Sequence, residues 1–186
     1  STNTGMSAHP SVAASGSYVY VAWQDDTAVS GSAPGSEIWM RVSNNNGASF
    51  GSAKRISYNA YASEYPSIAA SGNHVYVAWQ DATPVSGSGA SPEIWLRVSS
   101  NYGVSFGSAI RISYNTYDSW YPSVAAYGSY VYVSWYDWTP VSGSGGFWPE
   151  VWLRASSNNG ATFGPPIRIS NNAYRSWVPS VAAIGS

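Results

Sequence analysis

The sequence predicts an all-β fold of four-stranded antiparallel blades, the architecture of a β-propeller, and two observations carry this prediction. The first is an internal repeat, because the motif Pro-Ser-(Val/Ile)-Ala-Ala recurs with spacings of 56, 56 and 57 residues. It begins at Pro10, Pro66, Pro122 and Pro179. Residues 10–65 match residues 66–121 at 39 of 56 positions. The second is that each repeat contains four short segments of strand character, which is typical of a propeller blade.

The four segments of the first repeat follow one another between turn residues. The first strand is expected at 10–14 and the second at Tyr18–Asp25, where β-branched and aromatic residues dominate. Glu37–Ser43 is the third, and the short stretch around 53–57 is the fourth. Because no window repeats its apolar residues every 3.6 positions, we expect essentially no helix.

The second strand carries apolar or aromatic residues on both of its faces. Val19, Val21 and Trp23 alternate there with Tyr20 and Ala22. A blade buries one face against each neighbour, whereas a strand with one solvated face alternates cleanly between apolar and polar residues. A β-sandwich is the alternative fold, and the 56-residue period argues against it.

We expect residues 1–186 to form one repeat domain with blades at 10–65, 66–121 and 122–178, and residues 179–186 to supply the first strand of a fourth blade. Propellers typically use four to eight blades, so three cannot close a ring and two apolar flanks stay open. Closure requires either a second copy, which gives six blades, or a longer repeat chain of which this is a segment. Self-association, as a homo-oligomer or through neighbouring blades, is therefore the first partner interaction that we expect.

Composition excludes several classes of function. Charged residues make up 9% of the chain, and eight Lys and Arg against nine Asp and Glu give a net charge of −1. Without a basic surface we expect no nucleic-acid binding, and without a run near 18 apolar residues we expect no membrane insertion. The absence of cysteine excludes disulfides and thiolate metal sites. Uncharged polar residues combined with 10 Trp and 15 Tyr favour an extracellular or cell-surface location.

The turn between the third and fourth strands has a motif of its own. The segment Ser43-Asn-Asn-Asn-Gly-Ala-Ser-Phe50 recurs at 99–106 and at 156–163. It resembles the Asp-box, or bacterial neuraminidase repeat, of the sialidase-like β-propeller superfamily, whose pattern is Ser-x-Asp-x-Gly-x-Thr-Trp. Here Asn replaces the box Asp, and Phe replaces the Trp. The box residues are Ser43, Asn45, Gly47, Phe50, Ser99, Asn101, Gly103, Phe106, Ser156, Asn158, Gly160 and Phe163.

We expect these boxes to be structural. Gly47 can adopt the positive φ of a tight turn, Asn45 can accept hydrogen bonds from nearby backbone amides, and Phe50 can act as a hydrophobic plug beneath the blade. The resemblance implies a propeller whose functional sites lie on the face opposite the boxes. Because the superfamily includes sialidases, other glycoside-processing enzymes, lectin-like proteins and non-catalytic surface proteins, the fold alone does not choose a function.

Strand order places the long loops on that opposite face. In an antiparallel blade, the turns from first to second and from third to fourth strand share one edge, and the remaining connections share the other. These connections are the loops Asp26–Ser36, Ala82–Pro92 and Trp138–Pro149 and the connectors Tyr58–Tyr65, Tyr114–Tyr121 and Asn171–Val178. Function concentrates on such loops.

The ten tryptophans divide into two groups. Six repeat in register and are expected to pack in the blades: Trp23, Trp39, Trp79, Trp95, Trp135 and Trp152. Four do not repeat throughout, and all fall in loop-face segments that flank the third blade. With two neighbouring aromatics and one carboxylate they make up the candidate ligand residues, Trp120, Tyr121, Trp138, Phe147, Trp148, Trp177 and Asp137. Clustered exposed aromatics suit sugar rings, and an interface with another blade or chain is the alternative.

Most charged residues also repeat, which favours structural roles as inter-blade pairs or in cation–π packing. The repeating Glu and Arg residues are Glu37, Glu93, Glu150, Arg41, Arg97, Arg154, Arg55, Arg111 and Arg168. Asp25, Asp81 and Asp137 close the second strands, where they can cap loop amides, bind calcium or contact a ligand. Calcium takes six to eight oxygens, so one carboxylate per site favours capping, and we expect no metal and no cofactor.

An active site is asymmetric, whereas the charges of this chain nearly all repeat. The resemblance implies that a sialidase site would need three converging arginines, a Tyr nucleophile beside a Glu, and an acid Asp. No carboxylate pair of the kind used in glycoside hydrolysis stands out, so no catalytic residue is assigned and a non-enzyme is favoured. The sequence thus predicts a non-catalytic extracellular propeller with lectin-like glycan binding. The alternatives are a structural or assembly module without a small ligand, and a fragment of a sialidase-like glycoside hydrolase.

Overall fold

The computed structural model describes residues 5–27, 35–86, 91–141 and 147–185, and there the chain forms three four-stranded antiparallel sheets. The strands are β1 (Ser7–Ser15), β2 (Tyr18–Asp25), β3 (Glu37–Ser43), β4 (Lys54–Arg55), β5 (Ser63–Ser71), β6 (His74–Asp81), β7 (Glu93–Ser99), β8 (Ile110–Arg111), β9 (Ser119–Tyr127), β10 (Tyr130–Asp137), β11 (Glu150–Ser156) and β12 (Ile167–Arg168). In each sheet the strands pair in chain order, and no helix occurs in the described ranges. The predicted all-β architecture of four-stranded blades is therefore confirmed.

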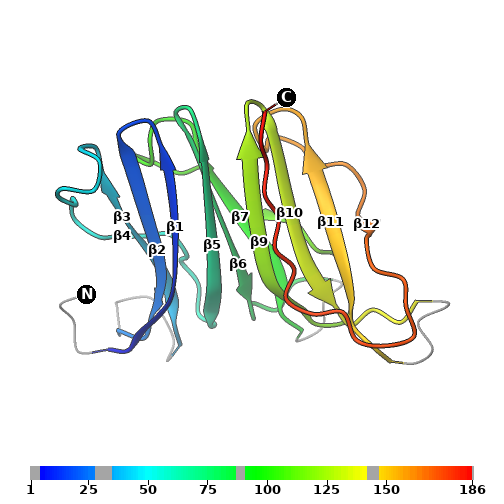
Figure 1. Cartoon of the computed structure of the whole chain (residues 1–186). Coiled ribbons are helices and arrows are strands. Elements are labelled where there is room, and N and C mark those ends of the chain that lie inside the picture. The colour runs from blue at the N-terminus through cyan, green and yellow to red at the C-terminus, as the bar shows by residue number, and fades with distance from the viewer. Residues whose placement is uncertain (1–4, 28–34, 87–90, 142–146, 186) are drawn as a thin grey trace.

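The three sheets stand side by side in chain order, like the blades of a fan (Figure 1). The first strands β1, β5 and β9 contact one another from blade to blade, so they form the inner side of the arc. The two-residue strands β4, β8 and β12 form the opposite edge of each sheet. Among the described segments there is no helix of the length and apolarity needed to cross a membrane.

The hydrophobic core lies between blades rather than within them. One cluster joins the first blade to the second, and its larger members are Tyr20, Ile38, Met40, Ile56, Ile68, Val75, Val77 and Trp79. A second cluster joins the second blade to the third in the same way, through Tyr76, Ile94, Leu96, Ile112, Val124, Val131, Val133 and Trp135. The second strand β6 contributes to both clusters, which explains why its residues are apolar on both faces.

The second and third strands of each blade have the predicted bounds, whereas the first strand was predicted too short. Each first strand begins at a serine three residues before the repeated proline. A bulge lies between the two halves of this strand, and the residue before the proline there is left-handed, with φ of 50° at His9, 51° at Tyr65 and 52° at Tyr121. Trp120 and Tyr121 consequently lie in β9 and not in a connector.

Residues 179–185, expected as the first strand of a fourth blade, form no strand, because the second strand that would pair with them is not part of this sequence. They nevertheless lie where that strand would lie. The amide of Val181 donates to Ser123 Oγ at 3.1 Å, as the amide of Val124 donates to Ser67 Oγ at 3.0 Å one blade earlier. We call residues 179–185 the C-terminal segment.

The repeating Glu and Arg side chains pair within a blade, where the sequence had suggested pairing between blades. Arg111 Nη2 lies 2.6 Å from Glu93 Oε1, and this ion pair ties the short strand β8 to β7. The corresponding pairs are Arg55–Glu37 and Arg168–Glu150. Burial raises the pKa of Glu93, and hydrogen bonds from Ser113 and Arg111 oppose that shift. The third-strand arginines do act between blades, since the Arg97 guanidinium lies 5.3 Å from the ring of Tyr58.

Each turn from third to fourth strand is closed by the side chains of its Ser and Asn. In the second blade, Ser99 Oγ accepts a hydrogen bond from the Gly103 amide at 2.9 Å and donates to Asn101 Oδ1, also at 2.9 Å. The same Asn101 oxygen accepts from the Ser105 amide at 3.0 Å. The first and third blades repeat this pattern. The Ser99 and Asn101 side chains thus satisfy the amides of Gly103 and Ser105 within the turn, and the Tyr102 amide donates to the Asn73 carbonyl of the neighbouring turn at 2.8 Å.

These turns also contact the preceding blade. Gly103 has φ of 76°, and a Cβ placed on it would lie 3.1 Å from Met40 Cε of the first blade, so both conformation and space favour glycine. Phe106 packs against the core between first and second blades, so this side chain plugs the inter-blade core rather than the underside of its own blade. Phe50 has no preceding blade and is exposed.

The Asn101 side chain offers a direct test of this turn. We expect Asn101→Ala to lower the free energy of unfolding by about 1 kcal/mol, because the oxygen that accepts from the Ser105 amide is lost. Asn101→Asp keeps the acceptor oxygen and should change stability by less than about 0.5 kcal/mol. Urea unfolding followed by tryptophan fluorescence measures both variants, and equal losses for both would contradict this role of the Asn oxygen.

Candidate functional site

The two edges of the blades differ in which turns and connections lie on them. The amide of Asn46 donates to the Ser17 carbonyl at 2.9 Å, so the turns from third to fourth and from first to second strand share one edge. The ends of the second strands, the starts of the third strands and the connectors between blades lie at the other edge, which is the lower one in Figure 1. We call this second edge the loop edge.

The aspartates at the ends of the second strands hold the loop edge together. In the third blade, Asp137 Oδ2 accepts hydrogen bonds from Asn115 Nδ2 at 2.6 Å and Ser119 Oγ at 2.8 Å. It also accepts from the indole nitrogen of Trp135 at 3.1 Å, and the Asp137 Oδ1 atom accepts from the Thr139 amide at 2.8 Å. Asp81 has the equivalent four donors. Because Asp137 is buried and its oxygens are occupied, we do not retain it among the ligand residues.

No group of three or more His, Cys, Asp or Glu side chains that could hold a metal ion is found among the described residues.

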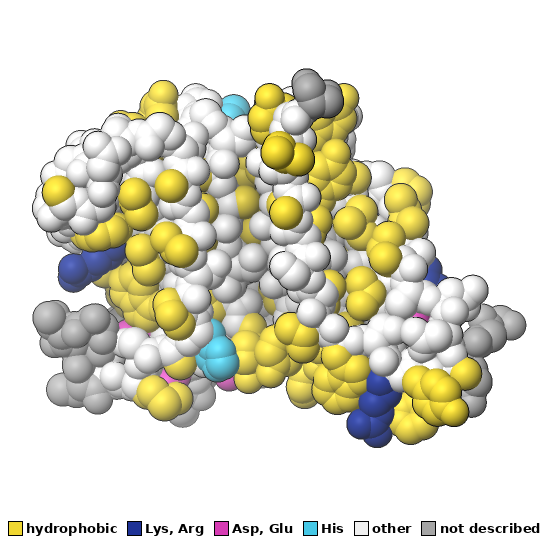
Figure 2. All heavy atoms as spheres, in the orientation of Figure 1, with side chains coloured by type: hydrophobic (Ala, Val, Ile, Leu, Met, Phe, Trp, Pro, Cys, Tyr) yellow, Lys and Arg dark blue, Asp and Glu magenta, His cyan; other side chains and the backbone are white. Residues whose placement is uncertain are grey.

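The non-repeating tryptophans meet at the loop edge of the third blade. The Trp138 and Trp177 rings are 6.3 Å apart and nearly perpendicular, and Trp177 lies 5.4 Å from Tyr136. Tyr136 in turn contacts Tyr121 at 5.7 Å and Trp120 at 6.2 Å. We call this group, together with Trp148, the third-blade aromatic surface. Figure 2 shows hydrophobic side chains gathered along this lower edge, with a basic side chain beside them.

Arg175 connects Trp148 to the rest of this surface. Its guanidinium carbon lies 4.6 Å from the Trp148 ring and 5.5 Å from the Trp177 ring, which are cation–π distances. Trp177 is 46% exposed, so one face of the group is open to solvent. Phe147, the remaining candidate, packs instead against Tyr117 at 5.5 Å and joins none of the described ring contacts of this surface.

Tyr136 is the member of the surface that the sequence analysis missed. It is buried beneath the exposed rings, and burial, followed by the neighbouring Tyr121, Tyr65 and Asp118, raises the pKa of Tyr136 to about 12. The Tyr136 side chain therefore stays neutral, and its ring is the buried base on which Trp177 and Tyr121 pack. Comparison of the repeats could have found it, because the equivalent residues in the first two blades are Gln24 and Gln80.

Comparison of the three repeats indicates whether the fold requires aromatic residues at the positions of Trp138 and Trp177. The residues equivalent to Trp138 are Asp26 and Ala82, and those equivalent to Trp177 are Ala8, Glu64 and Trp120. Blades with these other residues form the same sheets. The aromatic side chains of the third blade are therefore not required by the scaffold.

A row of side chains lines the inner end of the loop edge. His9, Tyr65 and Tyr121 occupy equivalent left-handed positions, with ring separations of 4.3 Å and 4.2 Å along the row. Gln24 Oε1 accepts a hydrogen bond from the Tyr65 amide at 2.9 Å, and Gln80 does the same for Tyr121. A side-chain hydrogen bond with Tyr121, together with burial, raises the pKa of Tyr65 to about 12. This row extends the aromatic surface toward the first blade.

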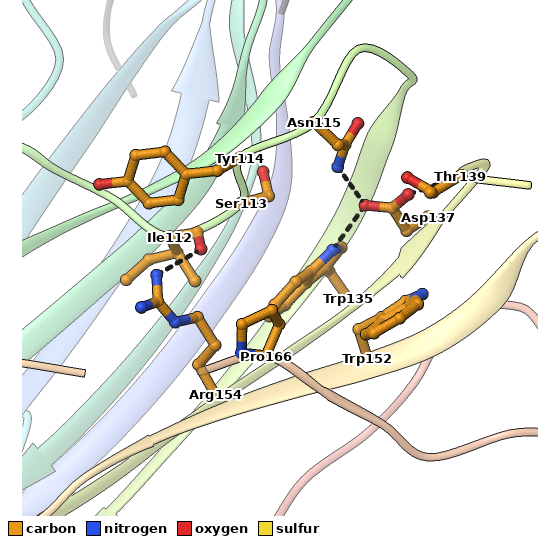
Figure 3. A pocket seen from close by; sticks show the side chains of 10 residues that line it. All are labelled: Ile112, Ser113, Tyr114, Asn115, Trp135, Asp137, Thr139, Trp152, Arg154 and Pro166. Atoms are coloured by element: carbon orange, nitrogen blue, oxygen red, sulfur yellow. Dashed lines mark hydrogen bonds between the residues drawn. The ribbon is translucent and has the colours of Figure 1, made fainter. Parts of the chain in front are cut away.

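A separate pocket of about 230 Å³ lies between the second and third blades. Figure 3 shows its lining, in which Trp135 and Trp152 stand opposite Tyr114 and Arg154. Its polar groups are largely engaged with one another, since Arg154 Nη1 donates to the Ile112 carbonyl at 3.0 Å. Much of the hydrogen-bonding capacity of the lining is therefore already used within the protein, with the indole nitrogen of Trp152 as an exception.

Comparison with known proteins identifies the fold. A family model described as the LVIVD repeat matches residues 8–29 and 65–83, and no curated protein sequence matches the chain. Trypanosoma rangeli sialidase superposes with a TM-score of 0.54 at 14% identity, over 85% of this chain and 30% of that one. A leech intramolecular trans-sialidase gives 0.62 at 9% identity, over 89% and 44%.

An α-L-arabinofuranosidase from Fusarium graminearum gives a TM-score of 0.55 at 12% identity, over 81% of this chain and 45% of that one. The chain thus has the β-propeller fold found in sialidases and arabinanase-like enzymes, and it spans less than half of the length of each of these structures.

The role of Asp137 as a loop cap can be tested. In Asp137→Asn an amide NH2 group replaces one carboxylate oxygen. This new donor faces groups that themselves donate to Asp137, so we expect the free energy of unfolding to fall by about 1–3 kcal/mol. Asp26→Asn, the matched change at an exposed carboxylate of the same edge, should stay within about 0.5 kcal/mol. Thermal unfolding by calorimetry measures both variants, and a neutral Asp137→Asn would refute the capping role.

Proposed function

We propose that this chain is a non-catalytic propeller that binds glycans through the third-blade aromatic surface. The observation that carries the proposal is that Trp138 and Trp148, which have no counterpart in the other repeats, meet Trp177 at one edge, where the Trp177 ring is open to solvent. Contiguous exposed apolar groups on a folded protein mark interaction surfaces or ligand-binding sites.

Sugar rings suit such a surface because a pyranose has one face of C–H groups and a rim of hydroxyls. The C–H face packs on an indole ring, while the hydroxyls stay in water or meet the few polar groups nearby. Arg175 supplies charged donors at the edge of the surface. The buried Tyr136 gives the exposed rings a rigid base, which lowers the entropy cost of ordering them around a ligand.

Two further parts of the prediction belong to this proposal. We assign the Ser-Asn-Gly turns to the Asp-box class, with Asn101 and its equivalents supplying the acceptor oxygen that the Asp would offer. We also assign the protein to the cell exterior, where glycans are abundant, and the uncharged, tryptophan-rich composition supports that assignment.

A fragment of a glycoside hydrolase is the second candidate. The solved structures similar to this chain include a sialidase and an α-L-arabinofuranosidase, and Glu64 adjoins Tyr65 on the inner row. Tyr65 makes its side-chain hydrogen bond with Tyr121, while Glu64 Oε2 accepts from Gln80 Nε2 at 3.4 Å, so Glu64 is not positioned as the base that a tyrosine nucleophile needs. Six arginines occupy equivalent positions in the three blades. These six therefore do not supply the asymmetric cluster of three arginines that a sialidase site needs. We therefore favour binding without turnover.

The first test removes one exposed ring. We expect Trp177→Ala to weaken binding of a glycan identified on an array by roughly 30-fold, because truncating an aromatic anchor of a binding site costs on the order of 2 kcal/mol. Trp138→Ala should act in the same direction. Isothermal titration calorimetry on the full chain measures the affinity.

Tyr130→Ala is the matched control, because this exposed aromatic lies on the same blade at the opposite edge. It should leave affinity unchanged. An array without any bound glycan, or equal losses for Tyr130→Ala and Trp177→Ala, would sink the proposed site.

The second test concerns turnover. Purified chain should release no fluorophore from a sialoside or an arabinofuranoside substrate at neutral pH, because no activated nucleophile has been identified at the inner row. Turnover that Tyr65→Phe abolishes would overturn the non-catalytic assignment in favour of the second candidate.

A further inference from the structure

The outward face of the first blade is an unpartnered copy of a surface that is buried in the other two blades. Val12 is 66% exposed, whereas the equivalent Ile68 and Val124 are 5% and 6% exposed. Val21 and Trp23 are half-buried here, and their equivalents in the second and third blades are fully buried. We call this face, with Phe50, the first-blade flank.

The outward face of the third blade is the complementary half. Ile169 is 58% exposed, whereas the equivalent Ile56 and Ile112 are each 1% exposed in the cores between blades. Tyr132 and Leu153 are half-buried, while their equivalents are fully buried. We call this face the third-blade flank.

The first-blade flank is hollowed where a neighbour would fit. A cavity of about 350 Å³ there is lined by Ser7, Ala8, Pro10, Val21, Trp23, Arg41 and Phe50. In the second blade the residues equivalent to Val21 and Trp23 pack against Ile56 of the first blade. The side chain that matches Ile56 on the third-blade flank is Ile169. The cavity therefore lies where, at both contacts inside the chain, an isoleucine of the preceding blade packs.

We infer that the first-blade flank of one copy binds the third-blade flank of a second copy. The contact is heterologous, because it joins two different surfaces, and two such contacts related by a twofold axis close two three-bladed arcs into a ring of six blades. The inference rests on the two internal interfaces and not on the proposed glycan site.

The C-terminal segment competes with this contact. It lies beside β9 as β5 lies beside β1 two junctions earlier, and it carries the same Pro-Ser-Val-Ala-Ala sequence as β1. Only one inner strand fits at the junction, so the segment must yield its place to β1 of the second copy. Asn171 also replaces Tyr58 and Tyr114, so Arg41 finds no aromatic ring there. Association is therefore weaker than the contact inside the chain and depends on concentration.

The experiment measures the mass of the full chain by sedimentation equilibrium over a range of concentrations. We expect a monomer–dimer equilibrium with no larger species. Val12→Glu and Ile169→Glu, both at exposed positions, should each raise the dissociation constant at least ten-fold. Val104→Glu, an equally exposed valine on the second blade, is the matched control and should leave the equilibrium unchanged.

Mixing the two flank variants distinguishes the heterologous contact from pairing of like flanks. The intact third-blade flank of the Val12→Glu chain can bind the intact first-blade flank of the Ile169→Glu chain, so the mixture should form a one-to-one dimer that neither variant forms alone. A chain that ends at Val178 should associate more tightly than the full chain, because the competing segment is gone. A monomer at all concentrations, dimers that either single variant leaves intact, or weaker association after the truncation would each overturn the inference.

Discussion

The central constraint on this structure is that the second strand of a blade has no solvent face. Tyr76 and Val77 are neighbours in β6 and both are fully buried, the first toward the third blade and the second toward the first. A single blade therefore buries little apolar surface by itself and depends on both neighbours. The inter-blade cores, the glycine contacts of the turns and the open flanks all follow from this arrangement.

Much of the fold could be predicted because the repeat samples the same pattern three times. The bounds of second and third strands follow from unbroken runs of β-branched and aromatic residues. The early start of the first strand could not be predicted, since a residue before proline ordinarily takes an extended conformation. Tyr65 precedes Pro66 with φ of 51°, and it is held there by Gln24 from another blade, which is a contact across 41 residues.

The candidate site was predicted in part, and the reasons differ between residues. Trp138 and Trp177 stood out because neither is present in every repeat. Tyr136 did not, because an aromatic residue inside an apolar strand has the pattern of a core residue. Asp137 caps the Thr139 amide as expected, but its donors Asn115 and Ser119 could not be predicted, since they lie 22 and 18 residues earlier in the chain and only the fold brings them to it.

The aromatic surface and the third-blade flank share one stretch of chain. Trp177 packs on Tyr136, and four residues later Val181 is fixed to Ser123 beside β9. If β1 of a second copy binds beside β9, it displaces the C-terminal segment, which follows Trp177 directly in the chain. The buried Tyr136 ring keeps its position. Linkage then requires reciprocity: if assembly changes the affinity of this surface for a ligand by some factor, the ligand changes the assembly by the same factor. Under the two proposals, the open flank and the exposed tryptophan therefore belong to one coupled equilibrium.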